Sequence, residues 1–457
     1  MAGSRESARR GAAFVFLLLL GAYLLTASGH LGGGCDEEVP FRIMERLWSR
    51  GTVTLDEELG GVKKGRGGRL YACFGLAQPV LAMPWFLAGR AAGLALGMDE
   101  RGVRAVERVF VAHFNAFVTA LGGALVYLLC LSLGASSRGA LWGALGYGLG
   151  SLAWSYSKTF MSEPLLATCL AGTALGVASG TARGALLGGL SLGVAVATRF
   201  FAVLALPPAI WALGRERGRA AAFGLAAGAG VAWSLAYNWW RYGNPLDFGY
   251  PEGVTWAFTA SVHRGLYGLL ASPGKGLIWY SPASALALWG LVRAARGGRD
   301  GAIRFSLWTF ALWLLFFSAR RQWWGAWSWG PRYLVPVLPL LSPGLAFLVD
   351  EWASEGARRR ILLGFSLLCL SAIVQLPALL VYNGLYLSVA TKVVPFSALL
   401  HKPALSPLLG HWALLSARTL DILPARLLIL SPAVGVLWCL PGILLLAIGV
   451  RGIVKGR

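Results

Sequence analysis

Three adjacent carboxylates follow the first long apolar segment of the chain. Glycines at positions 32–34 lead into Asp36, Glu37 and Glu38. If the apolar segment crosses a membrane, these acids stand where a lipid-linked substrate would present its head group. A carboxylate there can act as general base on an acceptor hydroxyl or amine. The alternative is a solvated loop whose acids balance the arginines of residues 42–50.

Another acid stands directly before a proline. Glu163 ends the polar run 157–163 and precedes Pro164. Proline suits the first turn of a helix, so Glu163 would lie at the positive N-terminal end of the next helix. This spacing fits a catalytic carboxylate, and it fits an ordinary helix-starting acid equally.

Cations recur in two segments that are rich in glycine and aromatic residues, 238–276 and 318–333. Glycine lets backbone N–H groups approach an anion, and next to cations this suits a phosphate or diphosphate. The aromatic side chains either stack on sugar faces or anchor the chain at a membrane interface. The cations next to these glycines that we single out are Lys275, Arg320, Arg321 and Arg332.

Histidine and cysteine give no indication of a metal site. The five histidines are dispersed, and His113 fits a buried residue better than a ligand. None of the six cysteines has CxxC spacing. Cys35 and Cys73 flank the first loop and are either a disulfide in an oxidising compartment or two free thiols. No cofactor is indicated, and a role for a divalent cation stays open.

The composition is that of a membrane protein. Of 457 residues, 56% are hydrophobic and 13% charged, and the mean hydropathy is +0.62. Apolar runs of about 20 residues recur and must close their own backbone hydrogen bonds, so we expect an all-α polytopic protein with one membrane domain over residues 1–457. The net charge of +21 does not indicate nucleic acid, because no basic run alternates with aromatics in a soluble module.

Twelve spans are predicted, and arginines set their direction. Arg5, Arg9 and Arg10 hold the N-terminus in the cytoplasm, and every later loop on that side is basic, so both termini are expected there. A cleaved signal peptide ending near residues 26–29 is the alternative for the first span. The spans are 12–28, 103–131, 139–155, 164–181, 184–198, 200–213, 220–239, 276–293, 304–319, 333–350, 360–383 and 427–450.

The polar chemistry is expected outside. The first extracytoplasmic loop, 29–102, would include short, broken interfacial helices over 70–97, because prolines interrupt that apolar stretch; a thirteenth span there would place the basic clusters outside. A single span over 184–213 is a further alternative, and it would place Arg199 within the membrane. The other outer segments are 240–275, 320–332 and 384–426.

Taken in order along the chain, these motifs resemble the GT-C superfamily of membrane glycosyltransferases, which includes protein O-mannosyltransferases and the bacterial transferase that adds aminoarabinose to lipid A. Each motif is weak alone, and the specificity comes from their order and their side of the membrane. They are Asp36 with Glu37 after the first span, residues 71–85, residues 157–159 before Glu163 and Pro164, Thr198 with Arg199, and the runs 272–276 and 327–333.

The resemblance implies sugar transfer from a polyprenyl-phosphate-linked donor to a lipid, glycan or protein acceptor on the extracytoplasmic face, with inversion at the anomeric carbon. Asp36 would be the base, with Glu37 as its neighbouring alternative, and Glu163 would position the acceptor or support Asp36. Cations would stabilise the leaving phosphate. The implied donor phosphate ligands are Lys158, Arg199, Lys275, Arg320, Arg321 and Arg332, and the substrate-binding aromatics are Tyr71, Trp329 and Tyr333.

Two features depart from the family pattern, and two rival functions remain. Three acids adjoin one another at Asp36, and no large soluble domain follows residue 384. A transporter or lipid flippase would carry ionisable residues inside its spans, whereas here nearly all charges fall in loops or at span ends, and no repeat relates the two halves. A ligase or polymerase using a lipid diphosphate would also suit the outer cations. Membrane lipids and the lipid-linked donor are the implied partners.

Overall fold

The computed structural model describes residues 2–214, 216–250, 257–298 and 301–455, and the regular elements of this part are helices and one β-hairpin, joined by loops. The hairpin pairs β1 (Val62–Lys64) with β2 (Leu70–Ala72) in antiparallel register, with Lys63 opposite Tyr71. The predicted all-α class is therefore confirmed, although the hairpin in the first loop was not predicted.

The helices up to the middle of the chain are α1 (Ala2–Leu25), α2 (Cys35–Arg50), η1 (Arg66–Gly68), α3 (Ala77–Ala95), α4 (Glu100–Ala112), α5 (Phe114–Ser132), α6 (Ser137–Gly148), α7 (Leu152–Tyr156), α8 (Glu163–Ala178), α9 (Ala182–Thr198), η2 (Phe200–Ala205), α10 (Leu206–Leu213) and α11 (Arg217–Tyr242). The later helices are α12 (Val262–Ala271), α13 (Leu277–Tyr280), α14 (Pro282–Arg296), α15 (Gly301–Ser318), η3 (Arg332–Val337), α16 (Leu338–Leu341), α17 (Pro343–Ser354), α18 (Arg358–Leu380), α19 (Leu385–Ala390), α20 (Phe396–His401), η4 (Pro403–Leu405), α21 (Pro407–Ala413), α22 (Leu423–Leu430) and α23 (Pro432–Lys455).

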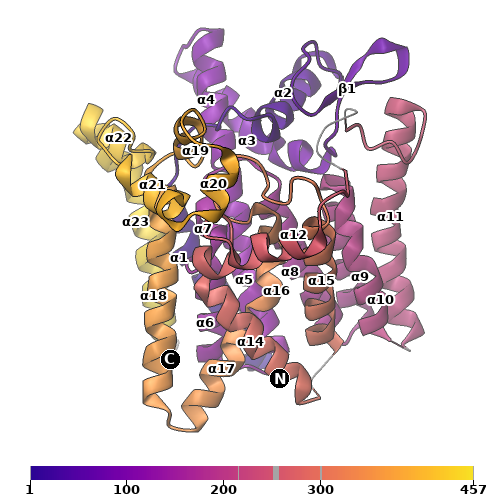
Figure 1. The fold of residues 1–457 in the computed structure, drawn as a ribbon, viewed down its shortest axis with the longest axis vertical. Helices are drawn as coiled ribbons and strands as arrows, with labels where there is room; N and C mark the ends of the chain where they lie inside the picture. The colour runs from indigo at the N-terminus through magenta and orange to yellow at the C-terminus, as the bar shows by residue number, and fades with distance from the viewer. Residues whose placement is uncertain (1, 215, 251–256, 299–300, 456–457) are drawn as a thin grey trace.

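The first and last helices of the chain pack side by side. A Cβ built on Gly21 of α1 would lie 2.6 Å from the carbonyl oxygen of Gly442 in α23, so the two backbones are in close contact. Both chain ends lie at one end of the bundle, while α2, β1 and α19–α22 gather at the other (Figure 1). The first loop and the 384–426 segment, which are far apart in sequence, are thus brought to the same end.

Glycines also bring α8, α9 and α11 together. A Cβ on Gly176 of α8 would lie 2.5 Å from the Cα of Gly188 in α9, and one on Gly230 of α11 would lie 2.3 Å from the Cα of Gly193. Small residues allow such close helix packing where lipid offers no hydrophobic driving force between helices. This three-helix layer fixes the end of α9, and with it the residue that follows, Arg199.

Six described helices are long and apolar enough to cross a membrane, or seven if the bent pair 332–341 and 343–354 counts as one span. They fall within or overlap the predicted spans near 12–28, 103–131, 220–239, 304–319, 360–383 and 427–450. The other predicted ranges hold shorter helices, such as α6 followed by α7 in 139–155. A multi-pass membrane protein is therefore the architecture, and the count of twelve remains a prediction.

The 70–97 stretch departs from its expected form. Residues 77–95 form one continuous helix, α3, with Pro84 inside it, so the prediction of short, broken helices was wrong. Proline removes a single intrahelical hydrogen bond. The close contact of Gly89 in α3 with the backbone of Glu107 in α4 packs the part of the helix after Pro84 against its neighbour.

Two alternatives that the sequence left open are decided by the structure. Arg199 has extended backbone (φ −145°, ψ 117°) between α9 and the 3-10 turn η2, which excludes one continuous helix over 184–213. Cys35 and Cys73 are both free thiols, Cys35 exposed and Cys73 buried. The disulfide is therefore excluded, and two free thiols flank the loop.

Candidate active site

Asp36 lies in the first turn of α2 and accepts hydrogen bonds from two arginines. Its Oδ1 is 2.9 Å from Nη2 of Arg199, and its Oδ2 is 3.0 Å from Nη1 of Arg332. The Asp36 side chain is 21% exposed, while those of the arginines are 7% and 10% exposed. One partly accessible carboxylate thus bridges two nearly buried cations, which come from the end of α9 and the start of η3.

Glu163, the first residue of α8, is the second acid that contacts Arg332. Its Oε1 is 3.2 Å from Nε of Arg332, an ion pair without hydrogen-bond geometry. Its Oε2 is buried and has no hydrogen-bond partner among the described residues. The structure thus brings together Asp36, Glu163 and two of the six predicted cations. We call Asp36, Glu163, Arg199 and Arg332 the Asp36 cluster.

The position of Arg199 follows from the break in the chain after α9. Its guanidinium donates from Nε to Oγ of Ser162 at 2.9 Å and lies 4.1 Å from the centre of the Phe74 ring. Tyr250 also forms a side-chain hydrogen bond with Arg199. Because these contacts fix the orientation of Arg199, its charge is available at one place, beside Asp36.

Arg332 follows a tightly turned loop, in which Ala326 and Gly330 have positive φ of 59° and 56°. A left-handed conformation costs an alanine about 1–2 kcal/mol, so other contacts must hold this loop. Lys275 supplies them: its Nζ donates to the carbonyls of Ala326, at 3.3 Å, and Ser328. Lys275 is fully buried and supports the loop from behind without joining the Asp36 cluster.

The neighbouring acids Asp36 and Glu37 have opposite electrostatic surroundings. Burial raises the pKa of Asp36, but Arg332 and Arg199 outweigh it and hold that pKa well below its usual range. Burial raises the pKa of Glu37, whose Oε2 accepts backbone N–H groups from Gly32 at 3.0 Å and Phe160 at 3.1 Å. Glu37 therefore ties the first loop to the 157–162 turn, and Asp36 alone of the two faces the cations.

Lys158 belongs to a separate buried group. Its Nζ lies 2.7 Å from Oδ2 of Asp421 and donates to the carbonyls of Leu379 at 2.8 Å and Asp421 at 3.0 Å. His30 contacts the other carboxylate oxygen of Asp421 through Nε2 at 2.6 Å. We call His30, Lys158 and Asp421 the Asp421 cluster. It joins the first loop, the 157–162 turn and the 384–426 segment.

The remaining predicted residues lie around these two clusters. Tyr333 stacks on Phe317 with ring centres 4.4 Å apart, and the guanidinium carbons of Arg320 and Arg332 lie 4.8 Å and 5.4 Å from the centre of the Tyr333 ring. Arg321 is exposed. Tyr71 and Trp329 are buried among aromatic rings, Tyr71 against Trp240 and Tyr242, and Trp329 between Tyr280 and His411.

An apolar cavity of about 380 Å³ adjoins the Asp36 cluster. It lies between α9 with η2 and α11, and its walls include Phe200, Phe201 and Leu204. Arg199 and Tyr250 line the same cavity, so the residue that binds Asp36 also closes one side of a hydrophobic space. The site therefore offers fixed cations and a carboxylate next to a compartment suited to a hydrocarbon chain.

Some contributors were not predicted. Asp421, His30, Ser162 and Tyr250 had no assigned role, although Asp421 is the lone acid of the 384–426 segment and Tyr250 lies in the aromatic run 238–276. Among the described residues, no group of three or more histidine, cysteine or acidic side chains could hold a metal ion.

Comparison with known proteins finds similarity only among solved structures. No protein family profile matches the chain, and no curated protein matches it. The chain is similar to ArnT from Cupriavidus metallidurans bound to undecaprenyl phosphate, with a TM-score of 0.49 and 13% identity over 97% of this chain and 74% of that one. The structure of the apo state of ArnT from the same organism gives a TM-score of 0.49 and 15% identity, over 96% of this chain and 76% of that one. Likeness at this level supports no transfer of activity or residue roles.

Proposed function

We propose that this protein transfers a sugar from a polyprenyl-phosphate-linked donor to a lipid, glycan or protein acceptor on the extracytoplasmic face, with inversion at the anomeric carbon. The observation that carries the proposal is Asp36 held between Arg199 and Arg332 at the side of an apolar cavity. A lipid phosphate donor needs both a compartment for its chain and fixed cations for its head group, and these two requirements meet at Arg199.

In this proposal the donor chain occupies the cavity beside α11, and its phosphate is bound by Arg199 and Arg332. The acceptor oxygen or nitrogen attacks the anomeric carbon on the face opposite the phosphate, so one C–O or C–N bond forms as the C–O bond to phosphate breaks. Negative charge then collects on the departing phosphate, and preorganised arginines stabilise this transition state more than the ground state. Both arginines are already oriented in the structure, so little reorganisation is required.

Asp36 acts as the general base. Because Asp36 is paired with the two arginines that also bind the donor phosphate, its pKa depends on whether the donor is bound. With both arginines engaged on Asp36, the pKa of that carboxyl is far too low for it to accept a proton effectively. A bound phosphate would take over part of the charge of the arginines, so the pKa of Asp36 would rise toward its ordinary value. Asp36 then takes the proton of the acceptor hydroxyl or amine, and Glu163 keeps Arg332 in position.

The other predicted residues keep more distant roles in the proposal. Lys275 and Arg320 support the loop and the aromatic layer around Arg332, and Glu37 and Lys158 hold the first loop in place. Tyr71 and Trp329 are buried among aromatic rings and support the site without contacting a sugar, Tyr333 remains the candidate for a sugar contact, and the exposed Arg321 is no longer assigned to the donor phosphate. The proposal retains the twelve spans, cytoplasmic termini, and outer segments 29–102, 240–275, 320–332 and 384–426.

Sugar transfer by the purified full chain tests the proposal directly. The assay supplies polyprenyl-phosphate sugars as donors and membrane lipid extract as acceptor, and product is detected by mass spectrometry. Replacing Asp36 by Asn should reduce transfer by about 10²–10⁴-fold, the usual contribution of a general base. Full transfer in Asp36→Asn would remove Asp36 as the base. Movement of labelled lipid across vesicles without any transfer would instead favour a flippase.

A further inference from the structure

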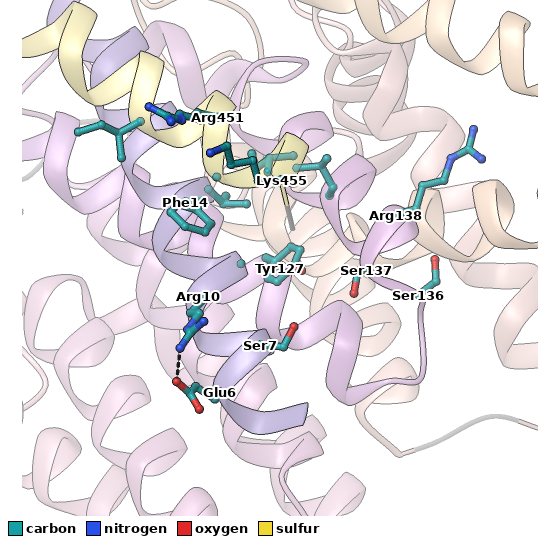
Figure 2. Close-up of a pocket in the computed structure, with 16 residues that line it drawn as sticks. Glu6, Ser7, Arg10, Phe14, Tyr127, Ser136, Ser137, Arg138, Arg451 and Lys455 are labelled. Carbon is teal, nitrogen blue, oxygen red and sulfur yellow. Dashed lines mark hydrogen bonds and ion pairs between the residues drawn. The ribbon is translucent and has the colours of Figure 1, made fainter. Parts of the chain in front are cut away.

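A second, larger cavity lies at the opposite end of the molecule from the Asp36 cluster. It is an open cavity of about 1250 Å³ bordered by the ends of α1, α5, α6 and α23. Figure 2 shows Phe14 and Tyr127 in its middle, with Arg10 and Lys455 on the helices to either side. Nothing in the proposed transfer reaction uses this space.

The charge of this cavity is strongly unbalanced. Four cationic side chains line it, Arg10, Arg138, Arg451 and Lys455, against one acid, Glu6, which is already paired with Arg10. The other three cations form no ion pair with any described residue. Like charges gathered around one space repel one another, so an anion bound there would be stabilised.

The walls and the position of the cavity favour a lipid over a soluble anion. Its lining includes apolar side chains from several helices, among them Phe14, Leu141 and Ile448. The helices α1, α23 and the α4–α5 unit are all candidate membrane spans, so a cavity at their ends lies at the membrane surface. Basic pockets between such helices bind anionic lipid head groups.

We propose that this cavity is a binding site for an anionic glycerophospholipid of the leaflet on the side of the chain termini. The phosphate would lie among Arg138, Arg451 and Lys455, and the acyl chains would run along α1 and α23. The arginine distribution predicts that this leaflet is the cytoplasmic one. The site would bind the two ends of the chain into one lipid-bridged unit, independently of any catalytic role.

Native mass spectrometry of the detergent-solubilised full chain tests this site. Phosphatidylglycerol and phosphatidylcholine with the same acyl chains are titrated separately into the wild-type protein, the triple variant Arg138→Gln/Arg451→Gln/Lys455→Gln, and a matched triple variant Arg358→Gln/Arg359→Gln/Arg360→Gln. The matched arginines are also exposed and lie near the α17–α18 turn at the same end of the bundle (Figure 1), but outside the cavity.

The wild-type protein should retain phosphatidylglycerol at least about tenfold more tightly than phosphatidylcholine. The cavity triple variant should lose about fivefold in affinity for each cation removed, since one cation near an anionic surface contributes about 1 kcal/mol. The matched triple should change by less than about twofold. Equal retention of both lipids, or equal loss in both triple variants, would overturn the proposal. Displacement of the lipid by glycerol phosphate at equal concentration would show that a soluble anion is the ligand, and would overturn it too.

Discussion

The Asp36 cluster and the Asp421 cluster are both buried groups of opposite charges, but their cations are satisfied in different ways. The Lys158 ammonium donates to two backbone carbonyls and forms an ion pair, without hydrogen-bond geometry, with the Asp421 carboxylate, which is 1% exposed. In the Asp36 cluster the arginines are held by a carboxylate that is 21% exposed, and one of them, Arg199, lines a cavity. The Asp421 cluster therefore leaves no room for a ligand at Lys158. In the Asp36 cluster a bound anion could replace the carboxylate at the arginines.

The different exposure of the two carboxylates distinguishes a structural ion pair, in the Asp421 cluster, from a candidate catalytic ion pair, in the Asp36 cluster. Removing one partner of a buried pair leaves the other charge uncompensated. In the Asp421 cluster the consequence should therefore be loss of stability. In the Asp36 cluster it should mainly be loss of donor binding or transfer. Each of the following variants tests one side of the contrast.

Asp421→Asn should have the largest effect on stability. It leaves the Lys158 charge buried without a carboxylate, and we expect the free energy of unfolding to fall by about 3–5 kcal/mol, measured by denaturant titration in detergent. Asp56→Asn is the control, because Asp56 pairs with Arg46 while its own side chain is 62% exposed, and it should cost less than about 1 kcal/mol. Sugar transfer per folded Asp421→Asn molecule should stay near the wild-type value. A selective loss of transfer would make Asp421 part of the active site.

Arg332→Ala should weaken donor binding more than stability. Losing a charged hydrogen-bond donor costs about 1.5–3 kcal/mol, so affinity for undecaprenyl phosphate should drop by about 10–100-fold. Arg321→Ala removes the same charge from an exposed position in the same outer loop and should change affinity by less than about threefold. Isothermal titration in detergent measures both values. Equal losses of affinity in the two variants would mean that these cations attract the phosphate only through their summed charge, without a specific contact from Arg332.

The pH dependence of stability should be small and should come from the Asp421 cluster. The hydrogen bond to Asp421 raises the pKa of His30 despite its burial, whereas the pKa of Asp36 is lowered. A histidine whose pKa is higher in the folded state than in the unfolded state stabilises the fold at pH values below its unfolded-state pKa. This stabilisation is lost as the pH rises through its folded-state pKa. Stability should therefore decline by less than about 1 kcal/mol from pH 6 upward, because the His30 side chain is 39% exposed. His30→Asn should flatten this thermal-unfolding profile, and an unchanged slope would assign it to another group.

The sequence predicted the helical class and the members of the Asp36 cluster better than it predicted the surroundings of the other cations. Asp36, Glu163, Arg199 and Arg332 lie at the ends of apolar segments, and charge patterning placed all of those ends on one side. Lys158 and Lys275 were grouped with the phosphate ligands, but their partners are mostly backbone carbonyls, which carry no residue-type signal. Asp421 could be noticed only as the lone acid of its segment, because the contact depends on how 384–426 folds back over the first loop.

Apolar runs were also better predictors of helices than of their exact breaks. The extended backbone at Arg199 and the uninterrupted α3 both depend on packing against neighbouring helices. Proline at position 84 predicted a break that the contact with α4 prevents. The hairpin at 62–72 is too short and too charged for its alternation to be recognised before the structure was known.

The central claim is that Arg199 and Arg332 bind the donor phosphate, and that Asp36 binds these arginines only until the donor arrives. Titration of undecaprenyl phosphate into Asp36→Asn tests this claim most directly. Asparagine removes the competing negative charge while keeping the shape of the side chain. We predict that Asp36→Asn binds undecaprenyl phosphate at least as tightly as the wild-type protein, while Arg332→Ala in the same titration binds it much more weakly. A loss of affinity in Asp36→Asn as large as that in Arg332→Ala would contradict the account.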